Sequence, residues 1–175
     1  APVGSIFYAQ EPAACSWYFS SLGLLIDLVV KALAPVMPER AAAAHYGDSM
    51  VVIFSGQDSR NDNEFYVSIE ANTGGWGAWD GSDGQDCLIN NVNGSFRDYP
   101  IEVYEHRYPI RIMRYGIRDD SGGKGQFNGG NGSIREYHLT EDANLSLWFE
   151  RSKTPAWGLN GGQPGQAPQI EIEQP

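Results

Sequence analysis

Two acidic residues are spaced closely enough for general acid–base chemistry. Glu102 and Glu105 lie three residues apart, between Pro100 and Pro109. Two carboxyl groups in one cleft can divide the roles of proton donor and proton acceptor. In a strand they would point to opposite faces, whereas in a polyproline-II segment, which has three residues per turn, they would share an edge. The spacing allows a catalytic pair or a hydrogen-bonded structural pair, and it favours the structural pair because nothing in the sequence places these residues in a cleft.

A glycine-rich loop is the second candidate for chemistry. Residues 120–125 read Asp-Ser-Gly-Gly-Lys-Gly, and such a loop could turn backbone N–H groups toward an anion while Lys124 adds positive charge. It is not a P-loop, because the GxxxxGK[ST] spacing is missing and no helical pattern follows. We therefore expect a structural turn that joins two strands, with an anion site as the alternative. The candidates for substrate contact or structure are Glu102, Glu105, Asp120, Ser121, Gly122 and Gly123, and the sequence assigns none of them a catalytic role.

The possible metal ligands are poorly spaced. Asp80, Asp83 and Asp86 lie three apart, whereas an EF-hand loop needs ligands at alternate positions, so a solvated turn is favoured over calcium binding. The three histidines are scattered without HxH or HExxH spacing, and the two cysteines form no CxxC motif. We expect this chain to bind no metal or cofactor of its own.

The composition describes an acidic, glycine-rich chain. Its 175 residues carry 22 acidic and 12 basic side chains, a formal charge of −10, which argues against nucleic-acid or anionic-membrane surfaces. Glycine accounts for 21 of the 175 residues, or 12%, whereas an average protein has about 7% glycine. The few cysteines and the absence of a signal peptide predict a cytoplasmic location.

One strong helical pattern covers residues 16–34. Gly23, Asp27 and Lys31 belong to a narrow polar stripe on an otherwise apolar segment that ends at Pro35. The two central charges disfavour a membrane span. We expect a long helix buried on nearly all sides, partly covered by another chain or by sequence outside this one.

Strand patterns follow the helix. Apolar or alternating runs predict strands near residues 50–54, 65–69 and 108–117, and a hairpin near 133–139 and 143–150. A flexible tail is expected at 163–175. Between the strands, glycines recur three apart, as at Gly122/Gly125 and Gly129/Gly132. This period fits either polyproline-II segments that pack backbone to backbone or ordinary glycine-rich loops.

Residues 99–137 resemble the hydantoinase B/oxoprolinase family, which includes acetone and acetophenone carboxylase subunits. The family pattern runs roughly N-x-P-[IV]-E-x-x-E, then Y-P, then D-S-G-G-x-G-x-[FY]-R-G-G-x-G. The positions that match are Pro100, Glu102, Glu105, Tyr108, Pro109, Asp120, Ser121, Gly122, Gly123, Gly125, Gly129, Gly130, Gly132 and Arg135. Asp27 and Arg151 are among further matches outside this stretch. Asn128 and Asp98 depart from the pattern, which has arginine and asparagine there.

The resemblance implies a mainly β (α+β) fold. Barrel-like antiparallel sheets would run into polyproline-like segments, with one long N-terminal helix. It also implies that this chain is the C-terminal part of a longer B-type subunit, either one domain over residues 1–175 or a fragment, with its β- and glycine-rich region near 48–162.

The family's partner and cofactors would lie outside this chain. The resemblance implies that the partner is an ATP-binding subunit of the A type. ATP with Mg would bind there, and a divalent metal (Zn or Mn) would bind the N-terminal part of the B-type subunit. The implied function is ATP-dependent hydrolysis of a hydantoin or lactam, or carboxylation of a ketone, by a complex in which this chain is inactive alone.

A second class of function is a secreted glycan-binding β-domain. Five Trp, nine Tyr and Asp/Asn-rich loops would suit sugar stacking and calcium. The apolar helix and the DSGG…GG core favour the enzyme complex.

Overall fold

The computed structural model describes residues 2–5, 8, 10–13 and 20–173. Two α-helices and five strands are assigned in this part of the chain, with two single-turn 3-10 helices, η1 (Pro38–Arg40) and η2 (Ser59–Asn61). The α-helices and strands are α1 (Ser20–Leu33), β1 (Val51–Asp58), β2 (Glu64–Ala71), α2 (Ile101–Arg107), β3 (Ile110–Arg118), β4 (Gly132–Leu139) and β5 (Ala143–Trp148).

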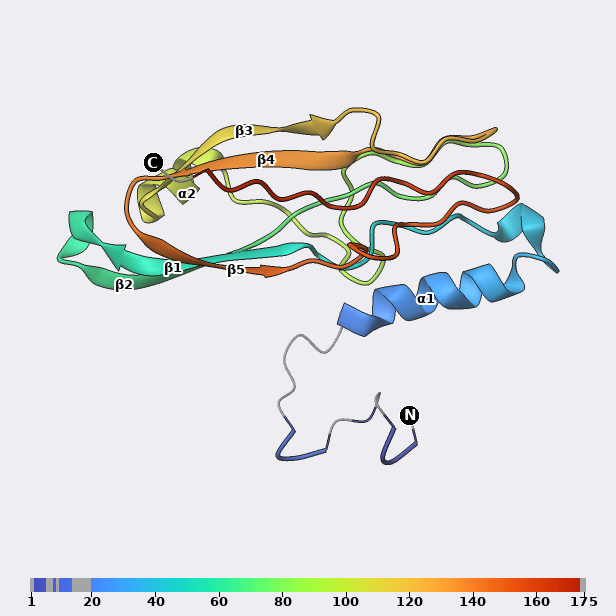
Figure 1. The fold of residues 1–175 in the computed structure, drawn as a ribbon, viewed down its shortest axis with the longest axis horizontal. Helices are drawn as coiled ribbons and strands as arrows, with labels where there is room; N and C mark the ends of the chain where they lie inside the picture. The colour runs from blue at the N-terminus through green and yellow to red at the C-terminus, as the bar shows by residue number, and fades with distance from the viewer. Residues whose placement is uncertain (1, 6–7, 9, 14–19, 174–175) are drawn as a thin grey trace.

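The strands form two antiparallel sheets that face each other. One sheet has the order β2-β1-β5, and the other pairs β3 with β4. Figure 1 shows them as two layers, with α2 at one end. The core between them contains Val52 and Phe54 of β1, Tyr66 of β2, Tyr104 of α2 and Ile110 of β3. Alternation along β1 and β2 sends these side chains inward and their neighbours outward.

Two of the expectations about the strands are wrong. The segments near 133–139 and 143–150 do not form a hairpin, because β4 pairs with β3 whereas β5 crosses to the other sheet and pairs with β1. The sheets also form no closed barrel in the described part of the chain: each is open, and they lie one over the other. The mainly β character and the antiparallel pairing are confirmed.

Beyond the sheets, extended stretches of chain run side by side without forming strand ladders. They lie near residues 41–47, 72–79, 82–88, 119–131 and 155–166 and fill the half of Figure 1 away from α2. Single backbone hydrogen bonds tie them together: Ala43 N–H to the Ala78 carbonyl (2.8 Å), Trp76 N–H to Gln85 (3.0 Å), Gly84 N–H to Asn128 (2.8 Å) and Gly130 N–H to Trp76 (2.8 Å). We call this region the glycine bundle.

Glycine is required where these stretches cross. A Cβ at Gly77 would come closer than 3.0 Å to the backbone of Ala43, and one at Gly130 would meet the Gln85 carbonyl in the same way. At Gly122 it would collide with the carbonyl of Gly129. No side chain fits between backbones at these distances, so backbone-to-backbone packing is the one of the two interpretations that fits Gly77, Gly122 and Gly130, whereas a Cβ at Gly132 would meet no backbone.

The first part of the C-terminal stretch, residues 163–167, is hydrogen-bonded to the bundle. A flexible tail is predicted from residue 163, whereas Gln163 N–H donates to the Lys124 carbonyl and Gln166 N–H to the Ser121 carbonyl. The Arg118 guanidinium also donates to the Ala167 carbonyl (2.9 Å). These bonds hold residues 163–167 against the loop that follows β3.

Helix α1 is shorter than the predicted long helix. It has 14 residues, and the expected start near residue 16 lies outside the described residues. On this chain alone one side of the helix is open, because Leu25, Leu28 and Val29 are each about half exposed (51–52%), so the expected burial on nearly all sides would need the cover from outside this chain that the sequence analysis allows for. Within the described chain, no helix is both long and apolar enough to cross a membrane.

The packing at Gly122 predicts a sharp contrast between two glycines. Gly122→Ala should lower the free energy of unfolding by roughly 1–3 kcal/mol, because its Cβ must displace backbone rather than a side chain. Gly132→Ala is the matched control, since a Cβ there meets only the Ser121 hydroxyl at 3.7 Å. Urea unfolding of both variants measures the difference. Equal stabilities would show that residues 119–131 behave as a loose loop.

Candidate functional site

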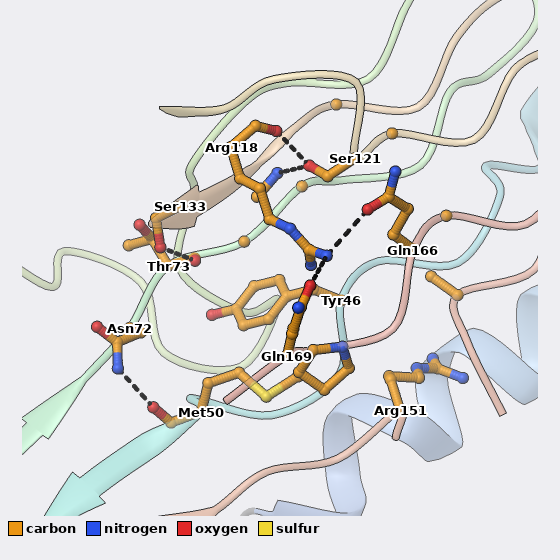
Figure 2. A pocket seen from close by; sticks show the side chains of 18 of the residues that line it. Tyr46, Met50, Asn72, Thr73, Arg118, Ser121, Ser133, Arg151, Gln166 and Gln169 are labelled. Atoms are coloured by element: carbon orange, nitrogen blue, oxygen red, sulfur yellow. Dashed lines mark hydrogen bonds between the residues drawn. The ribbon is translucent and has the colours of Figure 1, made fainter. Parts of the chain in front are cut away.

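A groove of about 2020 Å³ is lined by both sheets and by the glycine bundle. Figure 2 shows its polar part, where Tyr46 and Thr73 of the bundle, Arg118 at the end of β3 and Gln169 of the C-terminal stretch converge. Three of the candidate residues line it, namely Ser121, Gly122 and Gly123. Glu102, Glu105 and Asp120 are not among the lining residues. The structure therefore separates the six candidates into two groups.

Arg118 supplies a positive charge to this groove. One guanidinium nitrogen donates to the Ala167 carbonyl and another to the Gln166 side-chain oxygen (both 2.9 Å). These partners are neutral, and in the described part of the chain no carboxylate pairs with Arg118. Across the groove, Asn72 donates its amide to the Met50 carbonyl, while its buried side-chain oxygen has no partner. A half-buried cation facing polar groups can attract an anionic or carbonyl oxygen.

Ser121 is the centre of the loop that follows β3. Its buried hydroxyl donates to the Arg118 carbonyl (2.6 Å) and accepts from Gly132 N–H (2.8 Å). The N–H groups of Ser121 and Gly122 donate to the side-chain oxygen of Asn131 (3.1 and 3.2 Å). Two of the N–H groups that an anion would need are thus already bonded within the chain.

Asp120 and Gly123, the loop residues on either side of Ser121 and Gly122, differ in their surroundings. Asp120 is exposed with a positive φ of 57° and pairs with Lys124 at 3.1 Å in solvent. Gly123 lies against the Gln163 backbone, with no room for a Cβ. These contacts hold the bundle together. Only the side of Ser121, Gly122 and Gly123 that lines the groove is open to a bound molecule.

The Glu102–Glu105 pair lies on a helix, in neither of the conformations considered from the sequence. Both residues belong to α2, where Glu102 is exposed and Glu105 is half-buried. A Glu105 oxygen accepts from Ile112 N–H at 2.9 Å, which ties α2 to β3. The sequence could not show this helix, because Pro100 and Pro109 bracket a segment of only seven helical residues.

Two carboxylates of the acidic loop at residues 80–86 accept backbone N–H groups. Asp83 accepts from Asn128 N–H (2.7 Å) and Asp86 from Asn131 N–H (2.6 Å), so both hold the neighbouring glycine segment. Among the described residues, no group of three or more His, Cys, Asp or Glu side chains is arranged to hold a metal ion.

The sequence reasoning missed a buried ionic cluster between α1 and the bundle. Asp27 of α1 accepts from the Arg151 guanidinium (2.6 Å) and lies 2.8 Å from Nδ1 of His45. All three residues are at most 8% exposed. Arg151 and Lys31 both lie over the Trp157 ring, at 4.5 and 4.4 Å. The available signals were the presence of Asp27 in an apolar helix and the family matches at Asp27 and Arg151, but neither places these residues together, since they lie far apart in the sequence.

Further buried polar atoms near this cluster have no hydrogen-bond partner among the described residues. They include Nε2 of His45 and one carboxylate oxygen each of Asp48 and Glu150. Burial raises the pKa of Glu150 to about 7; the charge of Asp48 adds to this shift and Arg151 opposes it. A carboxyl group with this pKa exchanges its proton near neutral pH.

A second buried network joins the two sheets. Arg135 of β4 donates to Glu70 of β2 (2.8 Å) and to Asp98 (3.0 Å), and the Tyr137 hydroxyl also donates to Glu70 (2.9 Å). Arg135 lies over the Tyr115 ring at 3.9 Å. Burial raises the pKa of Glu70, although Arg135 opposes the shift. Asp98, where the family pattern has asparagine, gives Arg135 a second carboxylate partner.

The bonds of Ser121 predict a structural cost for its removal. Ser121→Ala leaves the Arg118 carbonyl and Gly132 N–H without their hydroxyl partner, so the free energy of unfolding should fall by about 1–3 kcal/mol. Ser152→Ala, at an exposed position, should change it by less than about 0.5 kcal/mol. Thermal and urea unfolding measure both. A Ser121→Ala protein as stable as the control would remove Ser121 from the framework.

The raised pKa of Glu150 predicts a pH dependence of stability. Unfolded Glu150 ionises near 4.5 whereas the folded residue keeps its proton up to about 7. Between these values the unfolded state binds fewer protons, so this residue makes stability fall as pH rises, with no further loss above about 7. Glu150→Gln should flatten the decline measured by urea unfolding across this pH range. An unchanged slope would assign the decline to other groups, such as Glu70.

Comparisons with known proteins agree with this architecture. The family model described as hydantoinase B/oxoprolinase matches residues 1–174. The putative B-type subunit of a D-/L-hydantoinase from Pseudomonas sp. (strain NS671) is 34% identical over 98% of this chain and 28% of its own length. The beta chain of the caprolactamase from Pseudomonas jessenii is 33% identical over 93% of this chain and 29% of its own length. The chain thus spans less than a third of these relatives.

A solved structure shares the fold. The nucleotide-free structure of acetone carboxylase, from work on ATP-dependent acetone carboxylation, matches with a TM-score of 0.61 and 23% identity. The match covers 78% of this chain and 18% of that one. Together with the family match across residues 1–174, the comparisons show that this chain belongs to the hydantoinase B/oxoprolinase family.

Proposed function

We propose that this chain is part of the B-type subunit of an ATP-dependent amidohydrolase or ketone carboxylase. Its substrate would be a hydantoin, a lactam or a ketone. The observation that carries the proposal is the family match over residues 1–174, on a chain whose glycine bundle depends on the same DSGG…GG segment. The names of the relatives, one from a hydantoinase and one from a caprolactamase, support a role as one component of a larger enzyme. Family membership favours this function over a secreted glycan-binding domain.

The part of this chain that would face substrate is the groove with Arg118. Phosphorylation of an amide or enol oxygen attaches an anionic phosphoryl group to it, and a guanidinium binds such a group better than a neutral donor does. Asn72 also lines this groove and adds a polar side chain to its wall. The glycine bundle would keep these groups in place, since its backbones cannot separate without breaking their contacts.

The remaining chemistry would lie on other parts of the complex. An A-type subunit would bind ATP with Mg and activate the substrate oxygen. The rest of the B-type subunit would hold a divalent metal, Zn or Mn, and direct water or carbon dioxide to the activated carbon. The cytoplasmic location expected from the sequence remains a prediction.

The proposal predicts activity only in the assembled complex. The purified chain should hydrolyse neither ATP nor 5-oxoproline, hydantoin or caprolactam, and should not carboxylate acetone. Adding the remaining B-type segment and the A-type subunit should produce ATP-dependent turnover of one of these substrates. Product analysis with ATP omitted provides the reference. Turnover by the chain alone, or full turnover without it, would contradict the proposal.

A pair of arginines tests the role of the groove in that complex. Arg118→Gln should reduce turnover at least tenfold, because it removes the cation that faces the substrate. Arg111→Gln changes an exposed arginine of the same strand that does not line the groove, and it should leave turnover unchanged. Equal turnover in the two variants would remove Arg118 from the substrate site.

A further inference from the structure

Helix α1 is oriented with its polar side toward the protein and its apolar side toward solvent. Gly23, Asp27 and Ala34 are buried against the bundle. The outward side is apolar and between 37% and 52% exposed, at Leu22, Leu25, Ile26, Leu28, Val29 and Leu33. A helix at the surface of a folded protein ordinarily turns its apolar side inward. We call this outward side the α1 face.

The buried ionic cluster fixes this orientation. Turning α1 to bury its leucines would expose Asp27 and leave Arg151 and His45 buried without their shared carboxylate. An uncompensated charge in the interior is strongly destabilising, because its desolvation is no longer offset by a partner. Close packing adds to this, because a Cβ at Gly23 would lie 3.0 Å from the Asn91 side-chain oxygen. The outward orientation of the α1 face is therefore fixed by the packing and the buried charges of this fold.

A second apolar strip lies on the same side of the molecule. Phe65, Val67 and Ile69 of β2 alternate with the core residues, so they point away from the β3-β4 sheet, and they are 45–66% exposed. In Figure 1, α1 and the β2-β1-β5 sheet both lie on the lower side, away from β3 and β4. One covering surface could thus extend from the α1 face toward this strip.

We propose that the α1 face is the docking surface for the part of the B-type subunit that lies outside this chain, which presents an apolar surface to it. This inference rests on the proposed function. The relatives leave ample sequence for such a cover, because this chain matches only 28–29% of their length. The α1 face carries no charged side chain at its centre, so an apolar surface is the complementary partner.

Area argues against a second copy of this chain as the cover. At about 1.5 Å per residue, a 14-residue helix is about 21 Å long, and with a contact width of about 10 Å its face offers roughly 200 Å². A stable interface between free proteins buries about 800 Å² on each partner. The remaining B-type segment can bury this face together with further surface of the chain, such as the strip on β2, because it would correspond to more than two thirds of the relatives' length.

The test uses a double variant of the α1 face and a control on the opposite layer. Leu25→Gln with Leu28→Gln makes the face polar at two half-exposed positions, and Met113→Gln alters a 61% exposed residue of β3. The probe is the remaining B-type segment from the same source, co-purified with each protein and titrated by calorimetry. We expect unchanged melting temperatures, a dissociation constant raised at least tenfold for the double variant, and no change for Met113→Gln.

Other outcomes would overturn the docking proposal. One is a wild-type chain that does not bind the probe, and another is a double variant that binds it as tightly as wild type. A third is a wild-type dimer in sedimentation velocity that the double variant abolishes, which would make a second copy the cover. Turnover separates this proposal from the proposed function: tight, α1-dependent assembly without ATP-dependent turnover would remove the function and leave the docking surface standing.

Discussion

The contact of backbone against backbone in the glycine bundle is the constraint on which the rest of this structure depends. Where the carbonyl of one stretch meets the Cα of a glycine on the next, as at Gly77 and Gly130, no side chain can fit. Isolated hydrogen bonds such as that from Gly84 to Asn128 then fix the register between stretches. The connection from β3 to β4 passes through this bundle, so the bundle sets how the β3-β4 sheet continues and where Arg118 enters the groove.

Two buried ionic networks hold other elements to this frame. Asp27, His45 and Arg151 attach α1 to the bundle, and Arg135 with Glu70 joins the two sheets. Buried ion pairs add little net stability, because desolvation offsets most of the attraction, but an alternative arrangement would leave charges unpaired. The networks therefore fix how the elements are oriented more than they add to the free energy of unfolding. The first network keeps the apolar side of α1 turned outward. The second holds Glu70 and Asp98 together, because both accept hydrogen bonds from the guanidinium of Arg135.

The features that depend on local pattern could be predicted from the sequence. Glycines three apart gave close backbone packing as one of two interpretations, and β-branched runs located the strands to within a few residues. Features that depend on distant partners were missed or wrong. The neighbouring runs at 133–139 and 143–150 indicated a hairpin, although β5 pairs with β1, where Leu145 lies opposite Phe54. The partners of Asp27 lie 18 and 124 residues away in sequence, and no local pattern reports such a cluster.

The most direct test of this account is amide hydrogen exchange, measured by NMR on the intact chain. If the glycine bundle is a fixed frame, the N–H groups of Ala43, Trp76, Gly84 and Gly130 should be protected to the same degree as those of β1, although they belong to no strand. Exchange at the rates of an unstructured peptide at these four positions, beside protected strands, would contradict the account, because the glycine-rich half would then be a set of loops and could not position the groove or α1.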